Sequence, residues 1–251
     1  MTARADRPVR ATKWRAARRF GASALIACIV VFIHAPAEAQ VGALVSIYSD
    51  DRFRGISVSD GRPVATFDVS YDTPNGPYAG LSASLVASRD EGLKPLSLVL
   101  NGGYATRISS SLAADVGIIH SRYSHYSGLI SGRDYTEFYA ALTGKVIGAR
   151  VSLSPNYLGL AGWTAHGEVD GHLNLTRRTV LEGSAGLLVP LRQSSYQERY
   201  VTQLDARLGI VRQLGPIALH AALTTHSGNA RIYGGKEHGR TALVIGISCV
   251  L

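Results

Sequence analysis

The residues best suited to chemistry lie at alternate positions of the segment TAHGEVDGHLNL, residues 164–175. His166, Glu168, Asp170 and His172 alternate there with small or apolar residues. Imidazole and carboxylate groups at this spacing could hold a metal ion or transfer protons. No further element of such a site is identifiable in the sequence, so a solvated, hydrogen-bonded polar face is the favoured interpretation. We therefore predict no catalytic, cofactor or metal site.

The dipeptide His120-Ser121 is the only local candidate for a nucleophile and its base. Neighbouring residues of a strand point to opposite faces, so these two side chains cannot form such a pair. His220 and His226 share a polar face farther along the chain. For them too, a solvated, hydrogen-bonded polar face is the favoured interpretation. The sequence thus favours a protein that is not an enzyme.

These polar residues are positioned by a two-residue period, which is typical of β-strands. Within 164–175, Ala165, Val169 and Leu173 fall on one face and the histidines and acids on the other. A strand of this kind separates two different environments. The same alternation recurs along the chain and predicts strands at roughly residues 41–54, 62–72, 78–88, 96–107, 111–122, 134–144, 147–157, 163–175, 179–191, 200–213, 216–226 and 240–251.

The connections between these strands alternate between long and short. RGISVSDG, YSHYSGLISGR, RQSSYQER and SGNARIYGGKEHG are long or polar, whereas TPNGP, ISS, KVIG, TRR and QLGP are tight turns. Long connections at one end and turns at the other describe an up-and-down antiparallel meander, as in transmembrane β-barrels. An even number of strands, each of about 11 residues, also suits a tilted membrane span. We predict an all-β transmembrane barrel of about 12 strands.

The two faces of the strands indicate which environment lies on each side. A water-soluble β-domain, the alternative, would fill its apolar face with large aliphatic side chains, but here that face is rich in Ala and Gly. Aromatics near strand ends, Tyr71, Tyr78, Tyr157, Trp163 and Tyr200, suit an interfacial girdle. An apolar exterior and a wet lumen follow, and the first strand must pair with the last, because lipid tolerates no open sheet edge. The predicted lumen-lining residues are Arg52, Arg54, Asp68, Arg150, His166, Glu168, Asp170, His172, Glu182, Asp205, Arg207 and His220.

The first 39 residues have the pattern of a secretory signal peptide. A basic region is followed by the apolar run GASALIACIVVFI and by APAEAQ, which places the cleavage before Gln40 and the barrel at 40–251. The run is too short for a membrane-spanning helix. Of 26 Lys and Arg and 18 Asp and Glu, this segment holds seven and two, which leaves 19 against 16. So small a basic excess gives no reason to expect nucleic acid as a partner.

The stretch SDDRFRGISVSDGRP, residues 49–63, resembles the TorF-type family of outer-membrane porins of Gram-negative bacteria. Family members show a run like S-D-Y-R-F-R-G-x-S-x-S-D-G-x-P, and this chain departs from it at Asp51, where an aromatic is usual. DYTEFYAAL, residues 134–142, is similar to the family's D-Y-x-E-x-Y stretch. The resemblance implies a monomeric β-barrel in the outer membrane with a channel role.

From the residues alone, the same stretch is expected to complete the first strand and its loop. Arg52 and Arg54 would then point into the lumen and Phe53 toward lipid or the interface, with the turn at Asp60-Gly61. The expected function is a porin for passive diffusion of small hydrophilic solutes, with outer-membrane lipid around it. A non-conducting surface or structural barrel with partner-binding loops, and a lipid-modifying barrel enzyme, are the alternatives.

Overall fold

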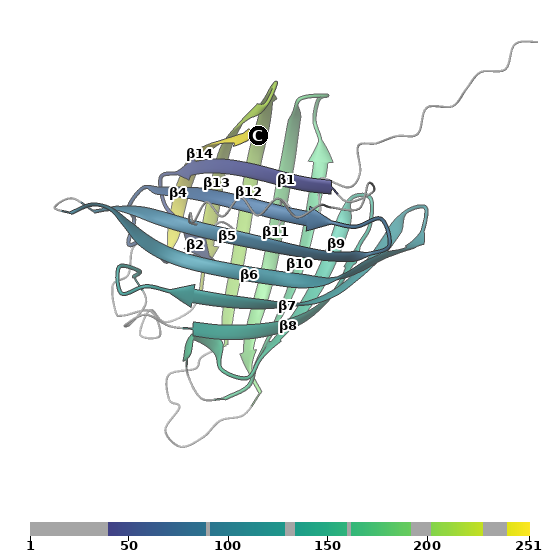
Figure 1. Cartoon of the computed structure of the whole chain (residues 1–251), viewed down its shortest axis with the longest axis horizontal. Coiled ribbons are helices and arrows are strands. Elements are labelled where there is room, and N and C mark those ends of the chain that lie inside the picture. The colour runs from purple at the N-terminus through teal and green to yellow at the C-terminus, as the bar shows by residue number, and fades with distance from the viewer. Residues whose placement is uncertain (1–39, 89–90, 129–133, 160–161, 192–201, 228–239) are drawn as a thin grey trace, which may run out of the picture.

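The computed structural model describes residues 40–88, 91–128, 134–159, 162–191, 202–227 and 240–251. All its strands except β2 and β3 form a closed, antiparallel barrel in which each pairs with the next barrel strand along the chain (Figure 1). The barrel strands are β1 (Gln40–Tyr48), β4 (Val64–Asp72), β5 (Pro77–Ser88), β6 (Gly92–Ser109), β7 (Leu112–Tyr123), β8 (Asp134–Thr143), β9 (Ile147–Ser154), β10 (Thr164–Asn174), β11 (Thr179–Pro190), β12 (Gln203–Leu214), β13 (Ile217–His226) and β14 (Thr241–Val250).

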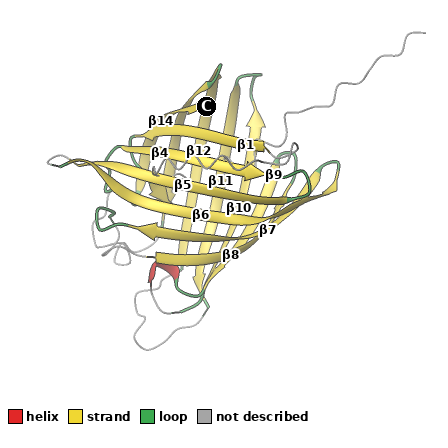
Figure 2. Cartoon of the chain, viewed as in Figure 1, coloured by secondary structure: helices red, strands yellow, loops and turns green. Residues whose placement is uncertain are grey.

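The barrel closes between its first and last strands, as the sequence predicts. β1 pairs with β14 from Leu44↔Val250 to Tyr48↔Gly246, and with β4 along its whole length. The backbone N–H of Leu251 also donates to the carbonyl of Ala43 at 3.1 Å. Figure 2 shows the described chain as strands joined by loops, apart from the short 3-10 segment η1 (Tyr157–Gly159). The prediction of an all-β barrel is confirmed.

Side chains alternate between the two faces of this wall with the predicted period. Val169, Leu208 and Ile245 are exposed on the outer face, at 54%, 56% and 56% of their surface. The alternate residues of each strand point inward, and three inward tyrosines pack against glycines of the neighbouring strand. A Cβ on Gly246 would stand 2.2 Å from the Tyr48 ring, and Gly103 and Gly117 accommodate Tyr78 and Tyr139 in the same way. The wall is therefore apolar outside and polar inside.

The first strand is shorter than the predicted range of 41–54. It ends at Tyr48, and the residues after it form a separate hairpin of β2 (Arg52–Phe53) and β3 (Ile56–Ser57). Arg54 and Gly55 connect these two strands with φ angles of 49° and 77°. Two successive residues with positive φ make a type I′ turn, which reverses the chain within two residues. The strand predicted for 147–157 likewise ends at Ser154, before η1.

The predicted signal peptide, residues 1–39, lies outside the described residues. Parts of three predicted long connections, at 129–133, 192–201 and 228–239, lie outside them as well. Within the described ranges, no helix combines the length and the hydropathy needed to cross a membrane.

Candidate functional site in the barrel lumen

The connection between β1 and β4 folds into the barrel instead of extending from it. We call residues 50–63 the inner hairpin. At its tip, Arg54 Nη2 donates to Glu137 Oε1 of β8 at 2.8 Å, and Gln203 Nε2 of β12 donates to the Arg54 carbonyl at 3.0 Å. Gly55 lies so close to β13 that a Cβ there would stand 2.4 Å from the Thr225 carbonyl oxygen. β12 and β13 are three and two strands from β1, whereas β8 lies across the barrel from β1 and β4. Because its tip reaches β8, the hairpin crosses the lumen.

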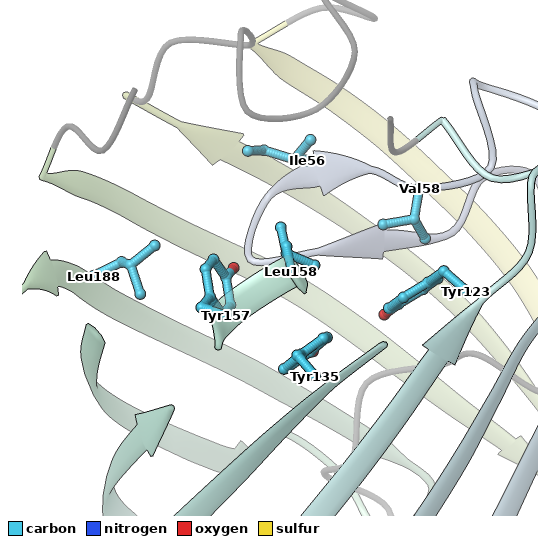
Figure 3. Packing of buried hydrophobic residues seen from close by; sticks show 7 residues of the cluster. All are labelled: Ile56, Val58, Tyr123, Tyr135, Tyr157, Leu158 and Leu188. Atoms are coloured by element: carbon cyan, nitrogen blue, oxygen red, sulfur yellow. The ribbon is translucent and has the colours of Figure 1, made fainter. Parts of the chain in front are cut away.

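A hydrophobic cluster anchors the inner hairpin inside the barrel (Figure 3). Ile56 and Val58 of the hairpin lie in one cluster with side chains from β7, β8, η1 and β11, namely Tyr123, Tyr135, Tyr157, Leu158 and Leu188. Phe53 joins it, with its ring centroid 6.1 Å from Tyr135 and 6.4 Å from Tyr157. The expected placement of Phe53 in lipid or the interface is therefore wrong, and so is that of Tyr157 in an interfacial girdle. Both rings pack into this cluster, which removes their apolar surface from water. Tyr78, expected in the same girdle, points inward instead, where its hydroxyl contacts Asp115 and Tyr139.

Hydrogen bonds within the hairpin explain the spacing of its polar residues. The Asp50 carboxylate accepts from Arg52 Nε at 2.7 Å, Ser57 Oγ at 2.6 Å and Ser59 Oγ at 2.7 Å. Arg52 Nη1 also donates to the Gly55 carbonyl at 2.8 Å. The arginine is thus turned back onto its own hairpin, with only 4% of its side chain exposed. Hydrogen bonds within the hairpin therefore hold together the stretch that carries the family resemblance.

Arg54 is the charged residue that joins the hairpin to the barrel wall. The Arg54 and Glu137 side chains are only 7% and 6% exposed, and the guanidinium lies 4.7 Å from the Phe53 ring centroid and 5.0 Å from that of Tyr157. Burial by itself lowers the pKa of Arg54, but Glu137 together with the neighbouring Tyr157 and Tyr135 more than offsets it and holds this pKa well above its ordinary value. Arg54 therefore remains charged and needs Glu137 as its counterion.

The inward-facing residues divide the lumen into a packed zone and an open zone. At the end that carries the long connections, inward side chains are buried around the hairpin, among them Thr66, Ser84, Ser121, Ser152, Thr164 and Thr224. Toward the tight turns, Glu182 Oε1 accepts from Arg207 Nη2 at 3.1 Å, and these side chains stay 38% and 41% exposed. Both residues point inward, so water reaches the inside of the barrel in this zone.

Other predicted lumen residues make contacts along the open zone. Asp68 accepts from Ser82, and His220 Nε2 lies 2.8 Å from Ser248 Oγ. Arg150 stacks on the Tyr139 ring, with its guanidinium carbon 4.4 Å from the centroid. Asp170 and His172 share the inward face of β10 with Glu168, and all three are half-buried.

One group forms a cluster that the sequence did not predict. His166 and Glu168 of β10 converge with Asp205 of β12, and His166 Nε2 lies 3.0 Å from Asp205 Oδ2. The sequence pattern had grouped His166 and Glu168 with Asp170 and His172 of their own strand, without Asp205. Glu137 and Gln203, which hold the hairpin tip, were also missed. The alternation of Tyr135, Glu137 and Tyr139 was visible, but it does not tell which residue across the barrel each one meets.

Comparison with family models gives a match over most of the chain. The profile of a family described as "Bacterial protein of unknown function (Gcw_chp)" matches residues 34–243. The narrower TorF-type resemblance stays a prediction. No curated protein matches the chain.

Three solved structures are similar to this chain to different extents. The NanC porin is 12% identical, with a TM-score of 0.52 over 84% of this chain and 100% of its own. A chain described under "Unveiling the Mechanism Behind the in-meso Crystallization of Membrane Proteins" is 8% identical, with a TM-score of 0.52 over 84% and 83%. A KdgM porin in complex with disordered oligogalacturonate is 10% identical, with a TM-score of 0.48 over 84% and 98%. At such identities, the first two likenesses show the fold alone.

Proposed function

The chain belongs to the Gcw_chp family of bacterial proteins of unknown function, and we propose that it is an outer-membrane porin. Small hydrophilic solutes would diffuse through a lumen that the inner hairpin narrows at one end. The solvent-accessible Glu182–Arg207 pair on the inner wall carries this proposal, because an ion pair at 38% and 41% exposure requires water inside the barrel.

The outer face supports a location in a lipid bilayer. Large aliphatic side chains cover it at alternate positions of strand after strand, for example Leu98 and Leu100 on β6 and Leu219 and Leu223 on β13. Exposure of so many large apolar side chains is unfavourable in water and favourable in hydrocarbon. The closed hydrogen-bonded wall leaves no sheet edge to lipid. The NanC porin, which has the same fold, adds a precedent for a channel.

A non-enzymatic role is part of the proposal. His120 is exposed on the outer face and contacts Thr136, whereas Ser121 is buried on the inner face. The two side chains lie on opposite sides of the wall, and a nucleophile needs its base within hydrogen-bond reach.

Conductance of the refolded protein in planar bilayers tests the proposal. The matched variant replaces residues 49–63 by an Asn-Gly turn, because Tyr48 and Val64 are already paired across β1 and β4. We expect discrete channels from the wild type and larger unitary conductance from the variant. The absence of channels from both proteins, each shown to be folded by heat-modifiable gel migration, would refute a porin.

The packed inner hairpin favours a second candidate, a non-conducting barrel whose connections bind a partner. Val58 and Tyr157 are completely buried there, as in a protein core. A silent wild type beside a conducting hairpin-deletion variant would support this candidate over the porin.

A further inference from the structure

The cluster of His166, Glu168 and Asp205 has the composition and size of a metal-binding site. One possible ligand atom from each residue lies within 4.8 Å of the other two. Ligands about 2.0–2.2 Å from a zinc ion lie roughly 3–3.5 Å apart. The 3.0 Å between His166 Nε2 and Asp205 Oδ2 already has that spacing, and a side-chain rotation of Glu168 would complete it.

Gly186 makes this arrangement possible. On β11 it is paired with Glu168 on one side and with Asp205 on the other. A Cβ at this position would stand 2.5 Å from His166 Nε2 and 2.7 Å from Asp205 Oδ2. The absence of a side chain therefore opens a pocket over β11 in which groups from β10 and β12 meet.

The net charge around the cluster favours binding of a cation. Glu168 interacts electrostatically with His166, Asp205, Arg150 and Arg54. His166 binds a metal only as the neutral imidazole, and Arg54 is already paired with Glu137 at 2.8 Å. Arg150 alone then faces two carboxylates, which leaves one negative charge uncompensated. Within the described residues, Glu168 makes no hydrogen bond or ion pair, and a desolvated carboxylate without a partner is unfavourable. A bound cation would remove this deficit.

We propose that His166, Glu168 and Asp205 bind a divalent first-row transition metal, of which zinc is the representative, inside the lumen. One imidazole and two carboxylates suit zinc or manganese, whereas calcium requires six to eight oxygen ligands. His166 and Asp205 are buried and Glu168 is half-buried toward the open zone. The ion would enter from that zone and complete its coordination with water.

Zinc competition with a chromophoric chelator, on the detergent-refolded barrel, tests the proposal. We expect one zinc per chain, and at least about a hundredfold weaker binding by the Glu168→Gln variant. Loss of residues that only orient metal ligands already weakens binding 10- to 100-fold. Cobalt should give a visible absorption spectrum in the wild type that is lost in Glu168→Gln. The measurement does not depend on conductance, so it stands apart from the proposed channel function.

Two further variants separate a metal site from a simple His–Asp hydrogen bond. Gly186→Ala keeps all three ligands but places a methyl group between His166 and Asp205, so it should also lose zinc. His172→Ala removes an inward histidine of the same strand, outside the cluster, and should bind zinc as the wild type does. The proposal is overturned if the folded wild type binds no zinc at micromolar concentration, or if His172→Ala loses zinc as completely as Glu168→Gln does.

Discussion

Replacing Arg54 by alanine should release the inner hairpin while leaving the barrel closed. Arg54 lies in the turn between β2 and β3 and takes no part in the barrel's strand pairing. Its guanidinium neutralises Glu137, whose side chain is only 6% exposed. Without it, a carboxylate remains buried and unpaired in the packed zone. This unfavourable burial ends if the hairpin leaves the packed zone and water reaches the Glu137 carboxylate.

The magnitude follows from the cost of an orphaned buried charge. Removal of one partner of a buried ion pair destabilises a structure by about 3–5 kcal/mol. Each 1.4 kcal/mol is a factor of ten in an equilibrium, so the released state should become roughly a hundredfold to a few thousandfold more populated. The hydrophobic cluster still favours the docked state, and the expected result is frequent opening instead of a permanently open channel.

Single-channel recording is the assay, with a double-mutant cycle to isolate the pair. Arg54→Ala should raise the frequency of large openings, and adding Glu137→Gln should suppress much of this effect because the unpaired charge is gone. Arg122→Ala is the matched control, since it removes a guanidinium that is 72% exposed, and surface pairs contribute about 0–1 kcal/mol. If Arg54→Ala is indistinguishable from Arg122→Ala in the frequency of large openings, the Arg54–Glu137 pair does not hold the hairpin in place.

Three other outcomes are expected. Deletion of residues 243–251 should leave β1 without its partner and abolish heat-modifiable gel migration, because the barrel can no longer close. Gly246→Val should destabilise the barrel by about 1–3 kcal/mol in urea unfolding from lipid vesicles, since a Cβ there stands 2.2 Å from the Tyr48 ring; unchanged stability would contradict this packing. Glu182→Gln should free the charge of Arg207 and shift the reversal potential under a salt gradient toward anion preference. It should barely alter folding, since that pair is about 40% exposed.

The barrel was predictable because its wall obeys a local rule. A strand between lipid and water must alternate polar and apolar side chains. The order of Glu168, Val169 and Asp170 therefore predicts which side of the wall each side chain faces. Register and closure then follow from antiparallel order and tight turns. The final strand illustrates this, since Leu243, Ile245 and Ile247 alternate to the outside as predicted.

The inner hairpin was not predictable by the same rule, because it imitates a strand. Arg52, Phe53 and Arg54 alternate as a wall strand would. The decisive feature is the positive φ at Arg54 and Gly55, and a sequence pattern of arginine followed by glycine does not require it. The partners of the hairpin are also distant, since Glu137 lies 83 residues along the chain. Contacts across a lumen carry no periodic signature in the sequence.

The size of the barrel gives a physical reason for an inward hairpin. An eight-stranded barrel can be filled by its own wall side chains, whereas wider barrels leave a lumen that must be either wet or occupied. In this chain the lumen is occupied by the hairpin at one depth and filled with water at another. The hairpin supplies Phe53, Ile56 and Val58 to the packed zone, while Glu182 and Arg207 remain solvated in the open one. The Arg54–Glu137 pair sits where the hairpin meets the wall, and a buried ion pair is better suited to fixing one docked arrangement than to adding stability. A change at this pair should therefore act on the passage before it acts on the fold.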